Sequence, residues 1–378
     1  MPSKSLTKWQ QWTNPSALDA AYARLPAIRK RSVWCCAKRS SRPRSRWNLW
    51  RPDLNRIGKT KFNPDRLRSV LFTTLTKEVI TMSQLLEILG TKYPIIQGPI
   101  GELNDPKMVA AVSEAGGFGM MALGFVQDPE KVKQMAAQVK ELTDKPFGAN
   151  LMIAMNPNNE AILEVLAEAG VKTVTTSAGS PKKIYPKIKE LGMKALHVTL
   201  AAPLALKATD AGADAVVVSG TESGGLRTTG PESTNLILIP LVCDMVDVPV
   251  VAAGGIADRR GFQAALALGA QGVQIGTAFL AAEESPASQS WKESIVGCGD
   301  AGTTLLPLGG MAMRTIINPK MSELMASGAD LTQEYNMGNA GKAWTTGNFD
   351  LFPAGAGQIS ALIKEIKPVK DIIEEIVS

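Results

Sequence analysis

The stretch Val248-Pro-Val-Val-Ala-Ala-Gly-Gly-Ile-Ala-Asp258, continued by Gly272-Val-Gln-Ile-Gly-Thr277, decides the fold of this chain. Its first apolar run, Val248–Ala253, ends at Gly254-Gly255, and a helix-like segment from Asp258 to Leu268 follows. Its second apolar run, Gly272–Ile275, ends at Gly276-Thr277. This order and spacing are typical of two neighbouring βα units in a parallel sheet.

Both glycine breaks lie where a strand gives way to a helix. Because glycine has no Cβ, backbone N–H groups at such a break can approach a phosphate dianion, and the helix N-terminus favours its charge. In a (β/α)8 barrel this is the phosphate site that follows strands 7 and 8. Gly254 and Gly255 could instead serve only a tight turn, but the matched break at Gly276 favours the phosphate site.

Short apolar runs recur upstream at intervals of roughly 20–30 residues, each followed by an amphipathic stretch typical of a helix. Near-continuous apolar strands indicate burial on both faces, as in parallel sheets. Eight alternating units in about 200 residues predict a TIM (β/α)8 barrel, with a doubly wound open sheet as the less fitting alternative. The expected strands are Tyr93–Gln97, Gly119–Ala122, Phe147–Ile153, Lys172–Thr176, Ala195–Leu200, Ala213–Ser219, Val248–Ala253 and Gly272–Ile275. The expected helices between them are Asp105–Ala115, Pro129–Leu142, Asn159–Ala169, Pro181–Leu191, Ala202–Ala211 and Thr234–Met245.

The barrel is expected to span residues 82–278, and the chain changes character after it. Residues 279–354 predict a helical insertion that caps the C-terminal mouth of the barrel, where an active site would lie. Its expected helices are Met311–Ile317, Pro319–Ala326 and Asp330–Met337. Residues 355–378 have the pattern of an amphipathic C-terminal helix packed on the barrel. Gly357-Gln358 at its start either face the mouth or only begin the helix.

Composition excludes several classes of function. No apolar run reaches the roughly 18 residues that a membrane span requires. The four cysteines have neither a disulfide pattern nor metal-ligand spacing, and a single histidine, His197, excludes a multi-histidine metal site. We therefore expect no metal and no membrane association.

The net charge of +6 averages two unlike pieces. Residues 1–81 hold 18 Lys and Arg against four Asp and Glu, a net of +14, and the remaining 23 and 31 give residues 82–378 a net of −8. The basic piece could bind nucleic acid, form a disordered tail, or come from an over-extended reading frame. The third alternative is favoured because Met82-Ser-Gln-Leu-Leu-Glu-Ile-Leu-Gly90 begins like a native N-terminus, so no nucleic-acid partner is expected. No apolar signal segment follows the first basic residues, and the acidic remainder points to the cytoplasm.

Six motifs in order carry a resemblance to a known family. From Met82 to the C-terminus the chain resembles the nitronate monooxygenase (2-nitropropane dioxygenase) family, which is related to flavin-dependent enoyl-ACP reductases; residues 1–81 have no counterpart in it. The motifs are Tyr93-Pro-Ile-Ile-Gln-Gly-Pro99, Lys145-Pro-Phe-Gly-Ala-Asn-Leu-Met152, Val174-Thr-Thr-Ser-Ala-Gly-Ser-Pro181, Gly220-Thr-Glu-Ser-Gly-Gly225, Ala253-Gly-Gly-Ile-Ala-Asp258 and Gln274-Ile-Gly-Thr277.

The resemblance implies an FMN-binding barrel. The phosphate of FMN would lie against Gly254, Gly255, Gly276 and Thr277, with Gln274 and Ile275 completing that side. Asn150 would bond the edge of the isoalloxazine, since an amide both donates and accepts; its alternative role is to cap a βα turn. Ser219 and Gly224 would contact the flavin, and Gln97, Gly98 and Pro99 would lie beneath its ring. We expect a small-molecule substrate, NADH or NADPH as an optional co-substrate, and a homodimer.

One position departs from the family. A histidine usually follows the Glu-(Ala/Ser)-Gly-Gly motif, but here Leu226 stands in its place, and leucine cannot transfer a proton. The next residue, Arg227, could bind an anionic substrate or a nicotinamide phosphate, or be a solvated loop residue. His197 on the fifth strand could face the mouth, but a packed strand histidine is favoured. Glu222 is expected to hydrogen-bond within its loop. The sequence therefore assigns no catalytic residue.

Three functions remain open at this point. The family favours the FMN-dependent oxidation of alkyl nitronates by O2, in which an already ionised substrate needs no strong base. The alternative is an NAD(P)H-dependent flavin reductase of an enoyl thioester, an enone or a quinone, because hydride transfer needs only a weak acid. The third is a flavin-binding protein without catalysis, for which Leu226 is the only argument.

Overall fold

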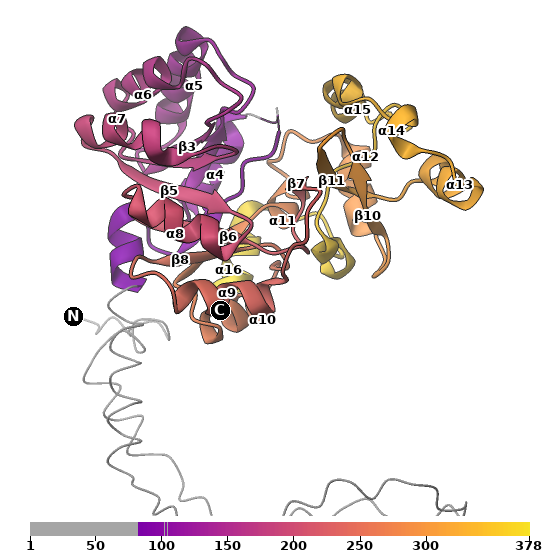
Figure 1. Ribbon diagram of the computed structural model, residues 1–378. Helices are drawn as coiled ribbons and strands as arrows, with labels where there is room; N and C mark the ends of the chain where they lie inside the picture. The colour runs from indigo at the N-terminus through magenta and orange to yellow at the C-terminus, as the bar shows by residue number, and fades with distance from the viewer. Residues whose placement is uncertain (1–81, 102, 104) are drawn as a thin grey trace, which may run out of the picture. The chain divides into compact units, whose positions relative to one another are not determined.

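The computed structural model describes residues 82–101, 103 and 105–378, and the expectations for residues 1–81 lie outside them (Figure 1). Eight parallel strands form one sheet in the order β1-β9-β8-β6-β5-β4-β3-β2. A parallel bridge between Ile96 and Phe118 links β1 to β2 and closes the ring. The predicted TIM barrel is therefore confirmed. Its strands are β1 (Ile95–Gln97), β2 (Gly119–Ala122), β3 (Phe147–Met152), β4 (Thr173–Ser177), β5 (Lys194–Thr199), β6 (Ala215–Ser219), β8 (Val250–Ala253) and β9 (Gly272–Ile275).

The helices that alternate with these strands begin at sequence signals that the chain supplies. The carboxylates of Asp105, Asp128 and Asp258 accept hydrogen bonds from the first turns of α4, α5 and α10, and proline stands near the start of the first two. The helices are α4 (Pro106–Glu114), α5 (Pro129–Leu142), α6 (Asn159–Glu168), α7 (Tyr185–Glu190), α8 (Ala202–Asp210), α9 (Asn235–Cys243), α10 (Arg259–Ala267) and α11 (Thr277–Leu280), with the 3-10 turn η1 (Pro181–Lys183) before α7.

Two apolar cores hold the barrel. The larger lies between the strands and the outer helices, and the smaller fills the barrel interior with residues such as Ile96, Phe118 and Val217. Residues 82–89 are helical and bury Leu85 and Leu89 in the smaller core. That helix therefore packs against the barrel interior and leaves the opposite end of the strands for a site.

The insertion after the barrel differs from the expected helical cap. Met311–Ile316 forms strand β11, which pairs with β10 (Thr303–Pro307) and with β7 (Gly225–Thr228), a strand in the loop after β6. The helix predicted at Met311–Ile317 is therefore wrong. The segment has no regular alternation of apolar and polar residues, and its pairing with β10 and β7 makes it a strand. The helical elements of the insertion are α12 (Gln289–Val296), α13 (Pro319–Ser327), α14 (Leu331–Glu334), η2 (Met337–Asn339) and α15 (Ala340–Thr346).

The C-terminal segment is also divided more finely than expected. A 3-10 turn, η3 (Gln358–Leu362), is followed by a short helix, α16 (Val369–Val377), instead of one continuous helix. Pro368 precedes α16 and separates the two pieces. The apolar face of α16 is buried and packs against α10 and α4. In the part of the chain described here, no helix has the length and apolar character to cross a membrane.

Candidate functional site

A cavity of about 430 Å3 opens where the carboxyl ends of the barrel strands meet the small sheet of β7, β10 and β11. Seven of the barrel strands, all except β1, contribute lining residues near their carboxyl ends, and Met311 and Met313 of β11 contribute others. Trp291 of α12 and Trp344 of α15 complete the wall on the side of the insertion. The cavity therefore occupies the position at which (β/α)8 barrels place their active sites.

Most of the residues that the sequence nominated for the cofactor line this cavity. They are Gly98, Pro99, Asn150, Ser219, Gly224, Gly254, Gly255, Gln274, Gly276 and Thr277. Gln97 and Ile275 are the exceptions. The side chain of Gln97 accepts a hydrogen bond from the N–H of Met120 at 3.1 Å, and Ile275 packs in the larger core. These two residues shape the strand ends rather than face the cavity.

The two glycine turns have the backbone geometry that the sequence predicts. Gly254 and Gly255 have φ values of +95° and +73°, a region that residues with a Cβ rarely adopt. A Cβ on Gly254 would collide with Ser223, whereas one on Gly276 would meet nothing within 4 Å. Among the described residues, no acceptor is hydrogen-bonded to the N–H of Gly255 or Gly276. The turns can therefore offer donors to an anion in the cavity.

Two amides supply further polar groups at the cavity wall. The side-chain oxygen of Gln274 is buried without a hydrogen-bond partner among the described residues, a state that costs free energy unless a ligand donates to it. Asn150 is held in place: its Nδ2 donates to Thr175 Oγ1 at 2.8 Å, and its Oδ1 accepts from Ser177 at 3.3 Å. One N–H of Asn150 remains for a ligand. Its partners lie on the neighbouring strand β4, so it does not cap a βα turn.

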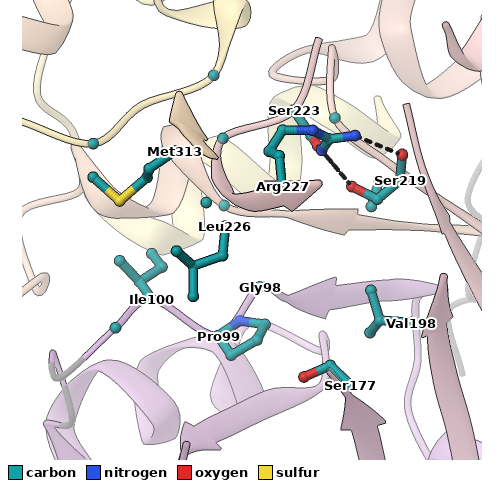
Figure 2. Close-up of a pocket in the computed structure, with 18 of the residues that line it drawn as sticks. Gly98, Pro99, Ile100, Ser177, Val198, Ser219, Ser223, Leu226, Arg227 and Met313 are labelled. Carbon is teal, nitrogen blue, oxygen red and sulfur yellow. Dashed lines mark hydrogen bonds between the residues drawn. The ribbon is translucent and has the colours of Figure 1, made fainter. Parts of the chain in front are cut away.

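Arg227 is buried and fully engaged rather than solvated. Its side chain is 0% exposed, and its Nε lies 2.7 Å from the carboxylate of Glu232. Its other nitrogens donate to the hydroxyl and carbonyl of Ser219 and to the hydroxyl of Ser223, as Figure 2 shows in part. Of the two alternatives for Arg227, the solvated loop residue is therefore wrong. Because Glu232 already balances its charge, Arg227 is also poorly placed to neutralise an anionic substrate.

His197 does not face the cavity. Its Nδ1 lies 2.9 Å from the hydroxyl of Thr176, and the edge of Tyr185 contacts its ring. The next residue, Val198, lines the cavity instead, because successive side chains of a strand point to opposite faces. Burial lowers the pKa of His197 to about 4 and keeps the ring neutral near pH 7. The packed-histidine interpretation is confirmed.

Leu226 borders an apolar region of the cavity. It pairs with Met313 across β7 and β11 and lies beside Ile100 (Figure 2). The nearby insertion contributes Met311, Met337 and Trp344 to the same wall. Among the described residues that line the cavity, Arg227 is the only charged one. No Asp, Glu, His or Lys of that lining can therefore take the place of the missing histidine as a base.

The segment that closes the cavity beside the glycine turns includes Gly357, for which the sequence left open whether it faces the mouth. Residues 354–356 bond to β11, where Ala356 N donates to Arg314 O at 3.2 Å. Gly357 then lines the cavity and donates to Thr277 Oγ1 at 3.0 Å, while the side chain of Gln358 is exposed. The carboxylate of Glu222 accepts from the N–H of Asn235 at 3.0 Å, so its expected structural role is confirmed. These hydrogen bonds join segments that are distant in the sequence, so no local sequence pattern predicts them.

Known proteins resemble the chain over most of its length. A family model described as nitronate monooxygenase matches residues 82–378. The nitronate monooxygenase of Pseudomonas aeruginosa is 32% identical over 341 residues, which cover 77% of this chain and 97% of that protein. A relative from Rhodococcus jostii, (3aS,4S,5R,7aS)-5-hydroxy-7a-methyl-1-oxo-octahydro-1H-indene-4-carboxyl-CoA dehydrogenase, is 37% identical over 245 residues, 65% of this chain and 68% of its own. The structure of FabK from Thermotoga maritima aligns with a TM-score of 0.70 and 36% identity, covering 78% of this chain and 94% of that one.

Proposed function

The chain belongs to the nitronate monooxygenase family, whose members are flavin-dependent oxidoreductases, and on this premise we propose that it binds FMN and reduces an apolar conjugated carbonyl compound, such as an enoyl thioester, with NADH or NADPH. The family and the structural neighbours are enzymes, so a flavin-binding protein without catalysis is set aside. When bound, FMN supplies the means to accept hydride from a nicotinamide and to pass it to an electron-poor carbon.

The apolar wall around Leu226 is the observation that carries the proposal. Proton abstraction from a neutral nitroalkane needs a base near the substrate, and the described lining offers none. Hydride delivery to a conjugated double bond needs no base, and water can act as the weak acid that supplies the proton to the neighbouring carbon. The side chains of Leu226, Met313 and Ile100 would contact an apolar substrate. The dehydrogenase from Rhodococcus jostii, whose name specifies a CoA thioester, and FabK, an enoyl-ACP reductase, support a thioester.

The polar residues of the cavity would hold the cofactor. The N–H groups of Gly255 and Gly276 would donate to the phosphate of FMN, and a single terminal phosphate needs no dinucleotide-binding fingerprint. The remaining N–H of Asn150 and the unpaired oxygen of Gln274 would bond other polar groups of the flavin. Donors such as Asn150 at the ring stabilise the negative charge of the reduced state. Together these residues bind and orient the cofactor and leave the apolar wall to the substrate.

The oxidation of alkyl nitronates by O2 is the second candidate. The family model and the Pseudomonas aeruginosa relative favour it, and an ionised nitronate needs no base. Against it, the only charged side chain of the described lining is Arg227, which Glu232 already neutralises. An anionic substrate would therefore gain little from it.

One experiment separates the two candidates. The purified full-length protein is reconstituted with FMN and mixed anaerobically with NADH, NADPH or propionate 3-nitronate, each in a separate experiment. Rapid bleaching of the flavin absorbance by a nicotinamide, followed by reoxidation on adding an enoyl thioester, is the result expected. Bleaching by the nitronate alone would overturn the reductase in favour of the monooxygenase. Recovery of FAD, or failure to bind FMN, would contradict the assignment of the phosphate site.

A further inference from the structure

Asn235 connects helix α9 to the glycine turn after β8. It is the first residue of α9 and is 6% exposed. Its Nδ2 donates to the carbonyl oxygens of Ala253 and Gly254, both at 2.8 Å. The amide nitrogen of Asn235 can donate to both carbonyl oxygens, whereas its amide oxygen cannot donate, so these neighbours fix which end of the side chain faces the turn. Its Oδ1 has no hydrogen-bond partner among the described residues.

This contact sets the direction of a cavity donor. A trans peptide is planar, and its C=O and N–H point in opposite directions. Since the carbonyl of Gly254 points to Asn235, the N–H of Gly255 in the same peptide points away from it. Gly255 lines the cavity, and no described residue accepts from its N–H. We infer that Asn235 is a positioning residue, which orients the Gly254–Gly255 peptide so that its N–H donates to the phosphate of the flavin.

The turn is also held from other directions. Ser223 packs against the α-carbon of Gly254, and Arg227 donates to the Ser223 hydroxyl. The N–H of Asn235 itself donates to the carboxylate of Glu222 at 3.0 Å. The backbone of Asn235 is thus held in place by Glu222, while its side chain bonds to the turn. We call the contacts of Asn235 with Ala253, Gly254 and Glu222 the Asn235 clamp. A donor that is already held in position loses less free energy to ordering when its ligand binds. The inference rests on the proposed binding of FMN at this site.

The chain contains a matched control for this clamp. Asn159 is the first residue of α6, is also 6% exposed, and also has an Oδ1 without a partner among the described residues. Its Nδ2 likewise donates to two carbonyls, those of Ile153 at 3.0 Å and Asn156 at 2.6 Å. Asn159 does not line the cavity. Its replacement should loosen a βα loop to a similar degree at a distance from the phosphate site.

The test compares FMN with riboflavin, which lacks the phosphate. Dissociation constants for both are measured by fluorescence quenching on the full-length apoprotein and on its Asn235→Ala, Asn235→Ser and Asn159→Ala variants. We expect Asn235→Ala to weaken FMN binding about 10- to 100-fold, as for the loss of a hydrogen bond to a charged group, and riboflavin binding by less than roughly threefold. Asn235→Ser keeps one donor and should lie between. Asn159→Ala should keep the wild-type ratio of the two constants.

The outcomes distinguish the inference from the function on which it rests. If the wild-type protein binds FMN and riboflavin equally, the phosphate site and the proposed cofactor fail. If it prefers FMN and both Asn235 variants keep the full preference, the positioning role is overturned while the proposed function stands. An equal loss of preference in Asn159→Ala would also overturn that role, because the effect would then be a general loosening of loops. Asn235→Ser keeps the comparison open if the alanine variant fails to fold.

Discussion

Replacement of Arg227 by alanine should destabilise the fold, not merely weaken substrate binding. The side chains of Arg227 and Glu232 are 0% and 6% exposed, so solvent screens their charges very little. The alanine variant would leave the Glu232 carboxylate buried without its counter-ion and would remove the donors to Ser219 and Ser223. Loss of one partner from a buried ion pair costs about 3–5 kcal/mol. The free energy of unfolding should fall by that amount.

The assay is urea denaturation followed by far-ultraviolet circular dichroism, on the protein with and without FMN. The control is Arg260→Ala, because Arg260 forms a close pair with Asp258 but its side chain is 77% exposed. That variant should lose less than about 1 kcal/mol. Replacing both Arg227 and Glu232 should recover part of the loss, since no charge then stays unpaired. A loss for Arg227→Ala no larger than for Arg260→Ala, with only a raised KM for an anionic substrate, would refute the reasoning.

Three further predictions follow from the site and the barrel. Leu226→His should leave the rate of flavin reduction by the preferred nicotinamide nearly unchanged in stopped-flow mixing. The same variant should oxidise neutral nitroalkanes ~10²-fold faster, the lower end for a general base, because apolar neighbours lower the pKa of an imidazole. An unchanged rate of nitroalkane oxidation would contradict the view that Leu226 occupies the position of a missing base. Burial lowers the pKa of His197 to about 4 in the folded protein, whereas a histidine in the unfolded chain titrates at ~6.5. As the pH falls below ~6.5, the imidazole of the unfolded chain is protonated first, so the free energy of unfolding decreases. Between pH 7 and 4.5 the wild type should therefore lose about 2–3 kcal/mol more than His197→Gln, measured from urea midpoints; equal losses would contradict the burial argument. A chain that starts at Met82 should have the same affinity for FMN and the same melting temperature as the full chain, because residues 82–89 already cover the barrel interior. A melting temperature lower by more than ~4 °C would show that residues 1–81 contribute to stability.

The barrel could be predicted because each of its strands carries its own signal. A strand buried on both faces is a near-continuous apolar run, and β8 and β9 lie inside the runs that the sequence indicates. The glycine turns were visible for a similar reason, since the φ values of Gly254 and Gly255 require residues without a Cβ. Local chemistry alone decides such features.

The small sheet and the clamps could not be predicted because their causes are distant in the sequence. A short, mostly apolar segment such as Met311–Ile316 fits a helix or a strand, and its partner β7 lies more than 80 residues earlier. The role of Arg227 depends on Glu232, and that of Asn235 depends on two carbonyls 18 and 19 residues away. Nothing in the sequence around Asn235 distinguishes it from an ordinary residue at a helix start.

The two neighbours on β7 explain how one strand can serve both halves of the site. Leu226 lies in the apolar wall beside Met313, while Arg227 bonds to Ser219 and Ser223 next to the glycine turn, because successive strand residues point to opposite sides. The charge nearest the cavity therefore stabilises the cofactor side, and the position where the family places a histidine contributes only apolar surface. Neither side chain can move a proton to or from a substrate, so in the proposed reaction the flavin would supply the hydride and water the proton. Such a site is suited to hydride transfer.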